Sequence, residues 1–175
     1  MKKFALILLL FAAVVGIAFV FGTTTKETTN AAYLRVHIRA DSNESEAQAV
    51  KYKVRDEVVT FLTPVVAQCE TKSEAMTKIG QNLPAIEKVA ERVLHENGFP
   101  YGAKASLRKE EFPTRVYEDV TLEAGVYDAL ILELGSGKGD NWWCVVYPPL
   151  CFTGGGGNVV YKSKIAEIIK QFFGE

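Results

Sequence analysis

The most chemically distinctive part of the chain lies between Gly137 and Phe152. Both tryptophans, two of the three cysteines and two of the six prolines fall in this segment. Successive side chains of a strand point to opposite faces, so Trp142 and Trp143 would lie on opposite sides of a sheet. One ring can belong to the core, while the other, with its polar N–H, suits a partner-binding surface. The alternative is that both rings are structural.

The cysteine spacing predicts a disulfide between Cys144 and Cys151. The Pro148-Pro149 pair between them can turn the chain so that the two sulfurs meet. An oxidising compartment favours this bond. Cys69 is then left as a buried free thiol. Cys-x6-Cys is not a usual spacing for zinc ligands and the chain has only two histidines, so no metal or other cofactor is expected.

A thiol enzyme is the alternative chemistry for the same cysteine. Cys144 would be the nucleophile and His37 the base, with Asp41 or Asp140 orienting the imidazole ring. The chain would then be an exported thiol-dependent hydrolase of the cell envelope. His95, near the end of a predicted helix, is interpreted as a solvated residue.

A second polar group precedes the helical part of the chain. Residues 33–40 alternate between apolar and polar side chains, which predicts a half-buried strand with a polar outer face. Arg35, His37 and Arg39 belong to that face, and Asp41 follows at the end of the strand. We interpret this group as a candidate partner-binding surface. The alternative is a solvated face with ordinary ion pairs, worth about 0–1 kcal/mol each.

Two turns supply further candidates. Phe112-Pro113-Thr114-Arg115 predicts a proline-fixed turn that presents Arg115. Gly137-Lys138-Gly139 lacks the spacing of phosphate-binding loops and does not open a helix, so we predict a hairpin turn that can serve as a recognition loop. The candidate partner-binding residues of the whole chain are Trp142, Trp143, Asn141, Lys138, Arg115, His37, Arg39 and Asp41.

These residues need a framework, and three helices are predicted between residues 44 and 98. An apolar stripe with the period of a helix begins after Glu44. The helix boundaries are marked by Pro64 at the end of the first, Thr71 and Glu74 in capping-box spacing at the start of the second, Asn82 and Pro84 at the start of the third, and Gly98 at its end.

After Pro100 the pattern becomes that of strands. Strands are predicted over 104–109, 116–122, 126–134 and 142–147, and the last two are expected to form a hairpin around residues 135–140. The fold class is therefore α+β: an antiparallel sheet of about four strands with helices packed on one face, in a single domain.

The N-terminus has the form of an export segment. Lys2 and Lys3 precede a run from Phe4 to Gly22 without a charged residue, as in a secretory signal peptide or a signal anchor. The predicted order of segments is a signal peptide or anchor over 1–22, a polar linker over 23–32, the α+β domain over 33–152, a glycine-rich linker over 153–158 and an amphipathic helix over 159–175.

The composition is that of an ordinary globular protein. Charged residues make up 23% of the chain, hydrophobic residues 48%, and the formal net charge is -1. A mildly acidic domain has no electrostatic attraction to nucleic acid, so a nucleic-acid partner is not expected.

The motifs together resemble the stage II sporulation protein R family. The residues that carry the likeness are Leu34–Ser42, Lys51-x-Lys53-Val54-Arg55-Asp56, Phe112–Arg115, Gly137–Val145 and Pro148–Phe152. The likeness spans roughly residues 33–152. Its block Gly-Lys-Gly-Asp-Asn-Trp-Trp-Cys is long and rare in composition, which makes it specific.

The resemblance implies a signalling protein rather than an enzyme. Such a protein is made in the forespore of an endospore-forming bacterium and exported into the space between the two membranes. Its implied partner is a membrane-embedded aspartic protease of the mother cell, which then cleaves the inactive precursor of sigma-E. An uncleaved N-terminal segment would also attach the protein to the membrane.

Overall fold

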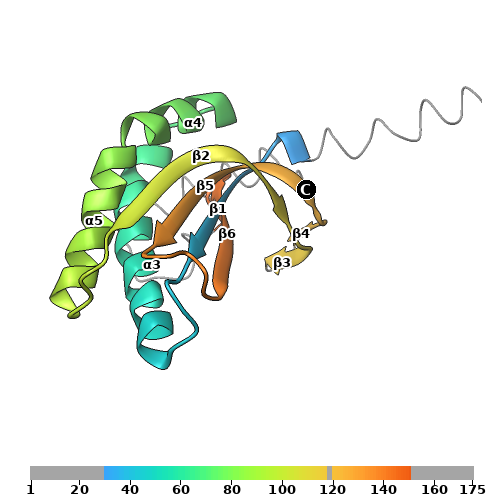
Figure 1. Ribbon diagram of the computed structural model, residues 1–175. Helices are drawn as coiled ribbons and strands as arrows, with labels where there is room; N and C mark the ends of the chain where they lie inside the picture. The colour runs from blue at the N-terminus through green and yellow to red at the C-terminus, as the bar shows by residue number, and fades with distance from the viewer. Residues whose placement is uncertain (1–29, 118–119, 151–175) are drawn as a thin grey trace, which may run out of the picture. The chain divides into compact units, whose positions relative to one another are not determined.

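The helices and strands of the computed structural model, which describes residues 30–117 and 120–150, follow the predicted order (Figure 1). Strand β1 (Leu34–Arg39) precedes three helices, α3 (Ser45–Val66), α4 (Lys72–Gln81) and α5 (Leu83–Glu96). The strands that follow are β2 (Ala103–Phe112), β3 (Arg115–Tyr117), β4 (Val120–Leu122), β5 (Gly125–Leu134) and β6 (Asn141–Tyr147). The predicted α+β class is confirmed.

Several predicted segments lie outside the described residues. These are the export segment 1–22, most of the linker 23–32, Cys151, the glycine-rich linker 153–158 and the helix 159–175. Within residues 30–117 and 120–150, no helix has both the length and the apolar character needed to cross a membrane.

The main sheet is mixed rather than purely antiparallel. Its strand order is β2-β5-β1-β6, with β1 parallel to β5 and antiparallel to β6. The predicted hairpin of β5 and β6 is therefore wrong, because β1 lies between them. Strands β3 and β4 form a separate two-stranded sheet, where the sequence predicted one irregular strand.

The three helices cover one face of the main sheet (Figure 1). On β1, Leu34, Val36 and Ile38 point into this helix-covered core. The stripe of α3 that meets them consists of Val50, Val54, Val58 and Leu62, all buried as their helical period predicts. We call the opposite face of the main sheet the outer face.

Most of the predicted helix boundaries are confirmed. Helix α3 ends at Val66, two residues after Pro64. The hydroxyl of Thr71 accepts a hydrogen bond from the Glu74 backbone N–H at 3.2 Å. Gly98 follows α5 with φ +84°, the left-handed conformation that favours glycine. Asn82 occupies the N-cap position of α5, but its side chain donates to the Lys78 carbonyl and does not cap the helix.

The glycine-rich segment 135–140 crosses over the end of β1 to reach β6. Its Gly139 N–H donates to the Ala40 carbonyl at 2.8 Å, and the Asp140 N–H donates to the Asn43 side chain at 2.6 Å. A Cβ atom at Gly139 would stand 2.3 Å from the Ser42 carbonyl oxygen. The close approach of two backbone segments therefore requires glycine at this position.

We expect Gly139→Ala to lower the free energy of unfolding by about 2–3 kcal/mol, because backbone atoms of Ser42 cannot move aside as a flexible side chain can. Gly80→Ala is the matched control. Gly80 lies in helix α4, and a Cβ atom there would make only an ordinary contact of 3.5 Å with the Leu107 side chain. That change should stabilise the fold by up to about 1 kcal/mol. Urea unfolding of both variants measures the difference, and equal stability would contradict the crossover packing.

Candidate functional site

The outer face carries the polar side chains of β1. Arg35 and His37 are only 0% and 4% exposed, and Arg39 is partly exposed. The prediction of a half-buried strand is therefore wrong for Arg35 and His37, and so is the alternative that they belong to a solvated face. The physical reason is the aromatic cover on this face, because the rings of Phe112 and Tyr127 lie over the Arg35 guanidinium.

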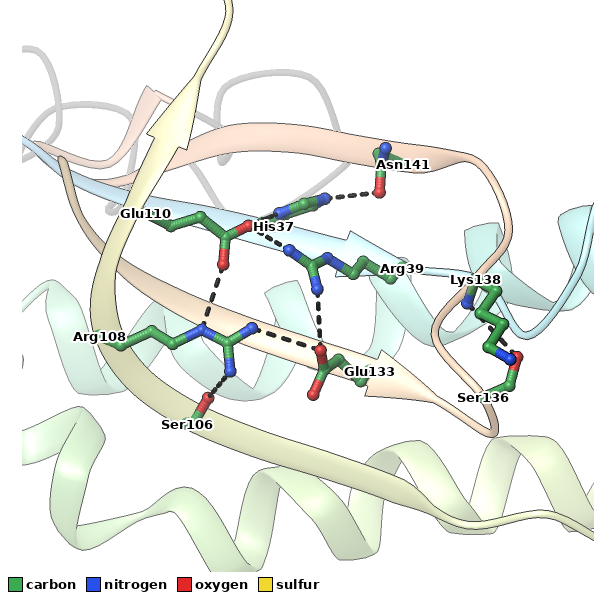
Figure 2. A network of polar contacts seen from close by, with 9 residues as sticks. All are labelled: His37, Arg39, Ser106, Arg108, Glu110, Glu133, Ser136, Lys138 and Asn141. Carbon is green, nitrogen blue, oxygen red and sulfur yellow. Dashed lines mark hydrogen bonds and ion pairs between the residues drawn. The ribbon is translucent and has the colours of Figure 1, made fainter. Parts of the chain in front are cut away.

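His37 is bonded through both ring nitrogens. Its Nδ1 lies 2.6 Å from Glu110 Oε1 on β2, and its Nε2 lies 2.7 Å from Asn141 Oδ1 on β6. Figure 2 shows the imidazole ring between these two side chains. The His37 ring on β1 thus connects β2, on one side of it in the sheet, with β6 on the other side.

Two arginines share two carboxylates beside His37. Arg39 donates to Glu110 at 2.5 Å and to Glu133 on β5 at 2.9 Å. Arg108 on β2 donates to the same two carboxylates at 3.2 and 3.3 Å (Figure 2). We call His37, Arg39, Arg108, Glu110 and Glu133 the charge cluster. Its two arginines are balanced by its two glutamates.

The charge cluster changes the acidity of Glu110. Burial raises the pKa of this carboxyl group, but hydrogen bonding from His37 and attraction from His37 and Arg39 together outweigh burial, so its pKa lies below the ordinary 4.5. The folded protein therefore holds the Glu110 proton less tightly than the unfolded chain does. This carboxylate stabilises the fold fully above about pH 4.5, and that contribution is lost as the pH falls through the lowered pKa.

We expect Glu110→Gln to cost about 2–4 kcal/mol of unfolding free energy at neutral pH, because it leaves partly buried cations without a carboxylate. The difference from the unchanged protein should shrink as the pH falls below 4.5. Thermal unfolding between pH 7 and 3 measures it. Glu111→Gln, at the exposed neighbouring position, is the control and should change stability by less than about 0.5 kcal/mol. A Glu110→Gln difference that stays constant across this range would rule out the linkage.

Trp143 and Arg115 meet at the edge of this cluster. The Arg115 guanidinium lies 4.4 Å from the centre of the Trp143 ring, and the His37 ring lies 5.4 Å from it. Arg115 is exposed and Trp143 is partly exposed. The structure therefore brings together five predicted residues, namely His37, Arg39, Arg115, Asn141 and Trp143.

The other three predicted residues lie elsewhere. Trp142 points to the helix side, where it packs against the core and Arg55 lies 5.6 Å from its ring. Asp41 accepts a hydrogen bond from the Ser136 N–H at 2.6 Å, so its carboxylate supports the crossover segment. Lys138 is exposed in that segment (Figure 2). The prediction that the tandem tryptophans lie on opposite faces is confirmed.

The sequence prediction missed Arg108, Glu110 and Glu133. The alternation of Ser106, Arg108 and Glu110 was a usable signal for one polar face of β2. It could not show that these residues meet His37, because that depends on the pairing of β2 with β5 and of β5 with β1.

The geometry argues against a Cys144–His37 catalytic pair. Cys144 pairs with Val36 in the β1–β6 register and points into the helix-covered core, while His37 points to the outer face. The sheet therefore separates the thiol from its predicted base. Cys69 is a buried free thiol, as predicted, and burial raises its pKa. The predicted partner of Cys144, Cys151, lies outside the described residues, so that disulfide stays a prediction.

The described residues contain no group of three or more possible metal ligands. Their fold and outer face define a class: a small α+β protein with one helix-covered sheet face and a second face rich in arginine, glutamate and aromatic side chains. Of these side chains, the arginines and the aromatic residues are the types enriched at surfaces that contact other proteins.

Comparison with known proteins identifies the family. The family model for stage II sporulation protein R matches residues 30–155, and the chain belongs to that family. Over 119 residues it is 35% identical to the stage II sporulation protein R of Bacillus subtilis (strain 168). These 119 residues make up 68% of this chain. The chain matches about half the length of this curated relative, 53%. No solved structure matches.

Proposed function

We propose that this protein is an exported signal of endospore formation that activates a membrane-embedded aspartic protease, which then processes the sigma-E precursor. Membership of the stage II sporulation protein R family is the observation that carries the proposal. The domain would act in the space between forespore and mother cell. The two lysines and the uncharged run that follows them at the N-terminus support export.

The outer face around Trp143 and Arg115 is the surface that we assign to the protease. Arg115 and Asn141 are exposed there, and the partly exposed Trp143 ring lies beside the charge cluster. Tryptophan and arginine are the residue types enriched at the energetic centres of interfaces. Hydrogen bonds on both sides of His37 hold the strands behind this surface together, so little ordering is left to occur on binding.

Activation requires that the ligand bind the active state of its receptor more tightly than the inactive state. A tenfold difference in affinity corresponds to about 1.4 kcal/mol. One charge-assisted hydrogen bond between an exposed arginine and the receptor can supply an interaction of this size. A few contacts that are stronger with the active state of the protease than with its inactive state would therefore be enough.

The test is co-expression of the full chain with the candidate protease and the sigma-E precursor, with precursor cleavage as the readout. We expect Arg115→Ala to reduce cleavage at least tenfold while thermal unfolding stays unchanged, because the side chain is exposed and lies over the Trp143 ring. Arg92→Ala, at an exposed position of α5 on the helix side, is the matched control and should cleave normally.

Two outcomes separate the parts of the proposal. If the unchanged protein produces no cleavage, the proposed function itself is wrong. If the unchanged protein works and Arg115→Ala works equally well, the protease binds another surface.

A further inference from the structure

Arg35 is a buried cation without an anionic partner among the described residues. Its side chain is 0% exposed. Its Nη2 donates to the Tyr117 hydroxyl at 2.9 Å, while Nε and Nη1 are buried and have no hydrogen-bond partner. Buried arginine is normally paired with a carboxylate, because an uncompensated buried charge is strongly destabilising.

Aromatic rings compensate only part of this charge. The Arg35 guanidinium lies 4.2 Å from the Phe112 ring centre, 4.8 Å from Tyr127 and 5.8 Å from Tyr117. Cation–π attraction acts on the face of the guanidinium, whereas the unpartnered N–H groups lie in its plane and need acceptor oxygens. The aromatic rings therefore retain the cation but leave its hydrogen-bonding edge unused.

A comparison with Arg39 on the same strand shows that the lack of a carboxylate partner is specific to Arg35. Arg39, four positions further along β1 on the same face, bonds to two carboxylates. Arg108 bonds to the same two. Glu110 and Glu133 thus balance Arg39 and Arg108, while Arg35 and Arg115 have no ion pair to any described residue. Of the two arginines of β1, only Arg39 has carboxylate partners, so Arg35 is the one without an ion pair to a described residue.

We propose that Arg35 is a binding site for a carboxylate group of the protein partner, with Arg115 as the exposed cation that attracts it. This inference rests on the proposed function, because it assigns the chemistry by which the activated partner is recognised. A carboxylate can bond to two nitrogens of a guanidinium at once, which a phenol cannot. Binding would exchange the Tyr117 hydroxyl for the carboxylate.

The position of Tyr117 permits this exchange. Tyr117 belongs to β3, which pairs with β4 and not with the main sheet. Moving its side chain away from Arg35 therefore breaks no hydrogen bond of the main sheet. Arg115 lies on the same short strand, so contact of a partner with Arg115 occurs two residues from Tyr117, one of the three rings around Arg35.

The first experiment compares Arg35→Met with Arg39→Met in full-length protein. Removing an uncompensated buried charge should leave the melting temperature equal or raise it, whereas removing Arg39 should lower it because two carboxylates lose their partner. Arg35→Met should nevertheless reduce cleavage of the sigma-E precursor at least tenfold. A residue whose removal raises stability and abolishes activation serves binding and not packing.

Arg35→Lys keeps the charge but not the planar pair of donors, and it serves if Arg35→Met does not fold. It should reduce cleavage at least tenfold. Normal cleavage by either folded variant, or a melting temperature of Arg35→Met lowered as far as that of Arg39→Met, overturns the inference.

A direct binding measurement separates this inference from the proposed function. We expect a hexaglutamate peptide, added to the full chain, to shift the NMR signal of the Arg35 Nε–H group, which is assigned by its absence in Arg35→Met. A hexaglutamine peptide should leave it unchanged. No shift with hexaglutamate overturns the carboxylate site, even if the protein activates the protease. A shift supports the site even if protease activation fails.

Discussion

The buried cations of β1 set the requirements that the rest of the sheet must meet. A guanidinium or imidazole ring can be buried at low cost only where acceptor oxygens reach it. Glu110 from β2 and Glu133 from β5 reach the cations that lie near the end of β1. A slip of β2 by one residue would turn Glu110 to the opposite face, so His37 would lose its carboxylate and Arg39 would keep only Glu133. The polar contacts therefore help to fix the register of three strands, in addition to the apolar packing on the other face.

The central position of β1 has a second consequence at its end. Because β5 and β6 lie on either side of β1, the segment between them must cross the point where the chain leaves β1 for α3. Gly139 permits that crossing, while the Asp41 carboxylate and the Asn43 side chain accept hydrogen bonds from the backbone N–H groups of Ser136 and Asp140. The most distinctive sequence block of the family resemblance thus serves two purposes. Its glycines belong to the architecture, while Trp143 belongs to the outer face.

The outer face contains arginines that are paired with carboxylates and arginines that are not. In the charge cluster each arginine is neutralised by glutamates, so this part holds strands together and has little charge left to attract a partner. Arg35 and Arg115 are stacked on aromatic rings instead. Unpaired cations on aromatic supports are suited to an incoming carboxylate. The sheet also separates Cys144 from His37, because the two side chains lie on opposite faces.

Sequence periodicity determined the α+β class, the three helices, the approximate strand positions and the opposite faces of Trp142 and Trp143, because these depend on contacts between neighbours along the chain. The motifs between Leu34 and Phe152 together, with the block around Trp142 the most specific of them, indicated the family. Strand order, the parallel β1–β5 pair and the burial of Arg35 and His37 were decided only by the tertiary structure. Local patterns cannot specify which distant strand supplies Glu110 or which rings cover a cation, since those depend on long-range register.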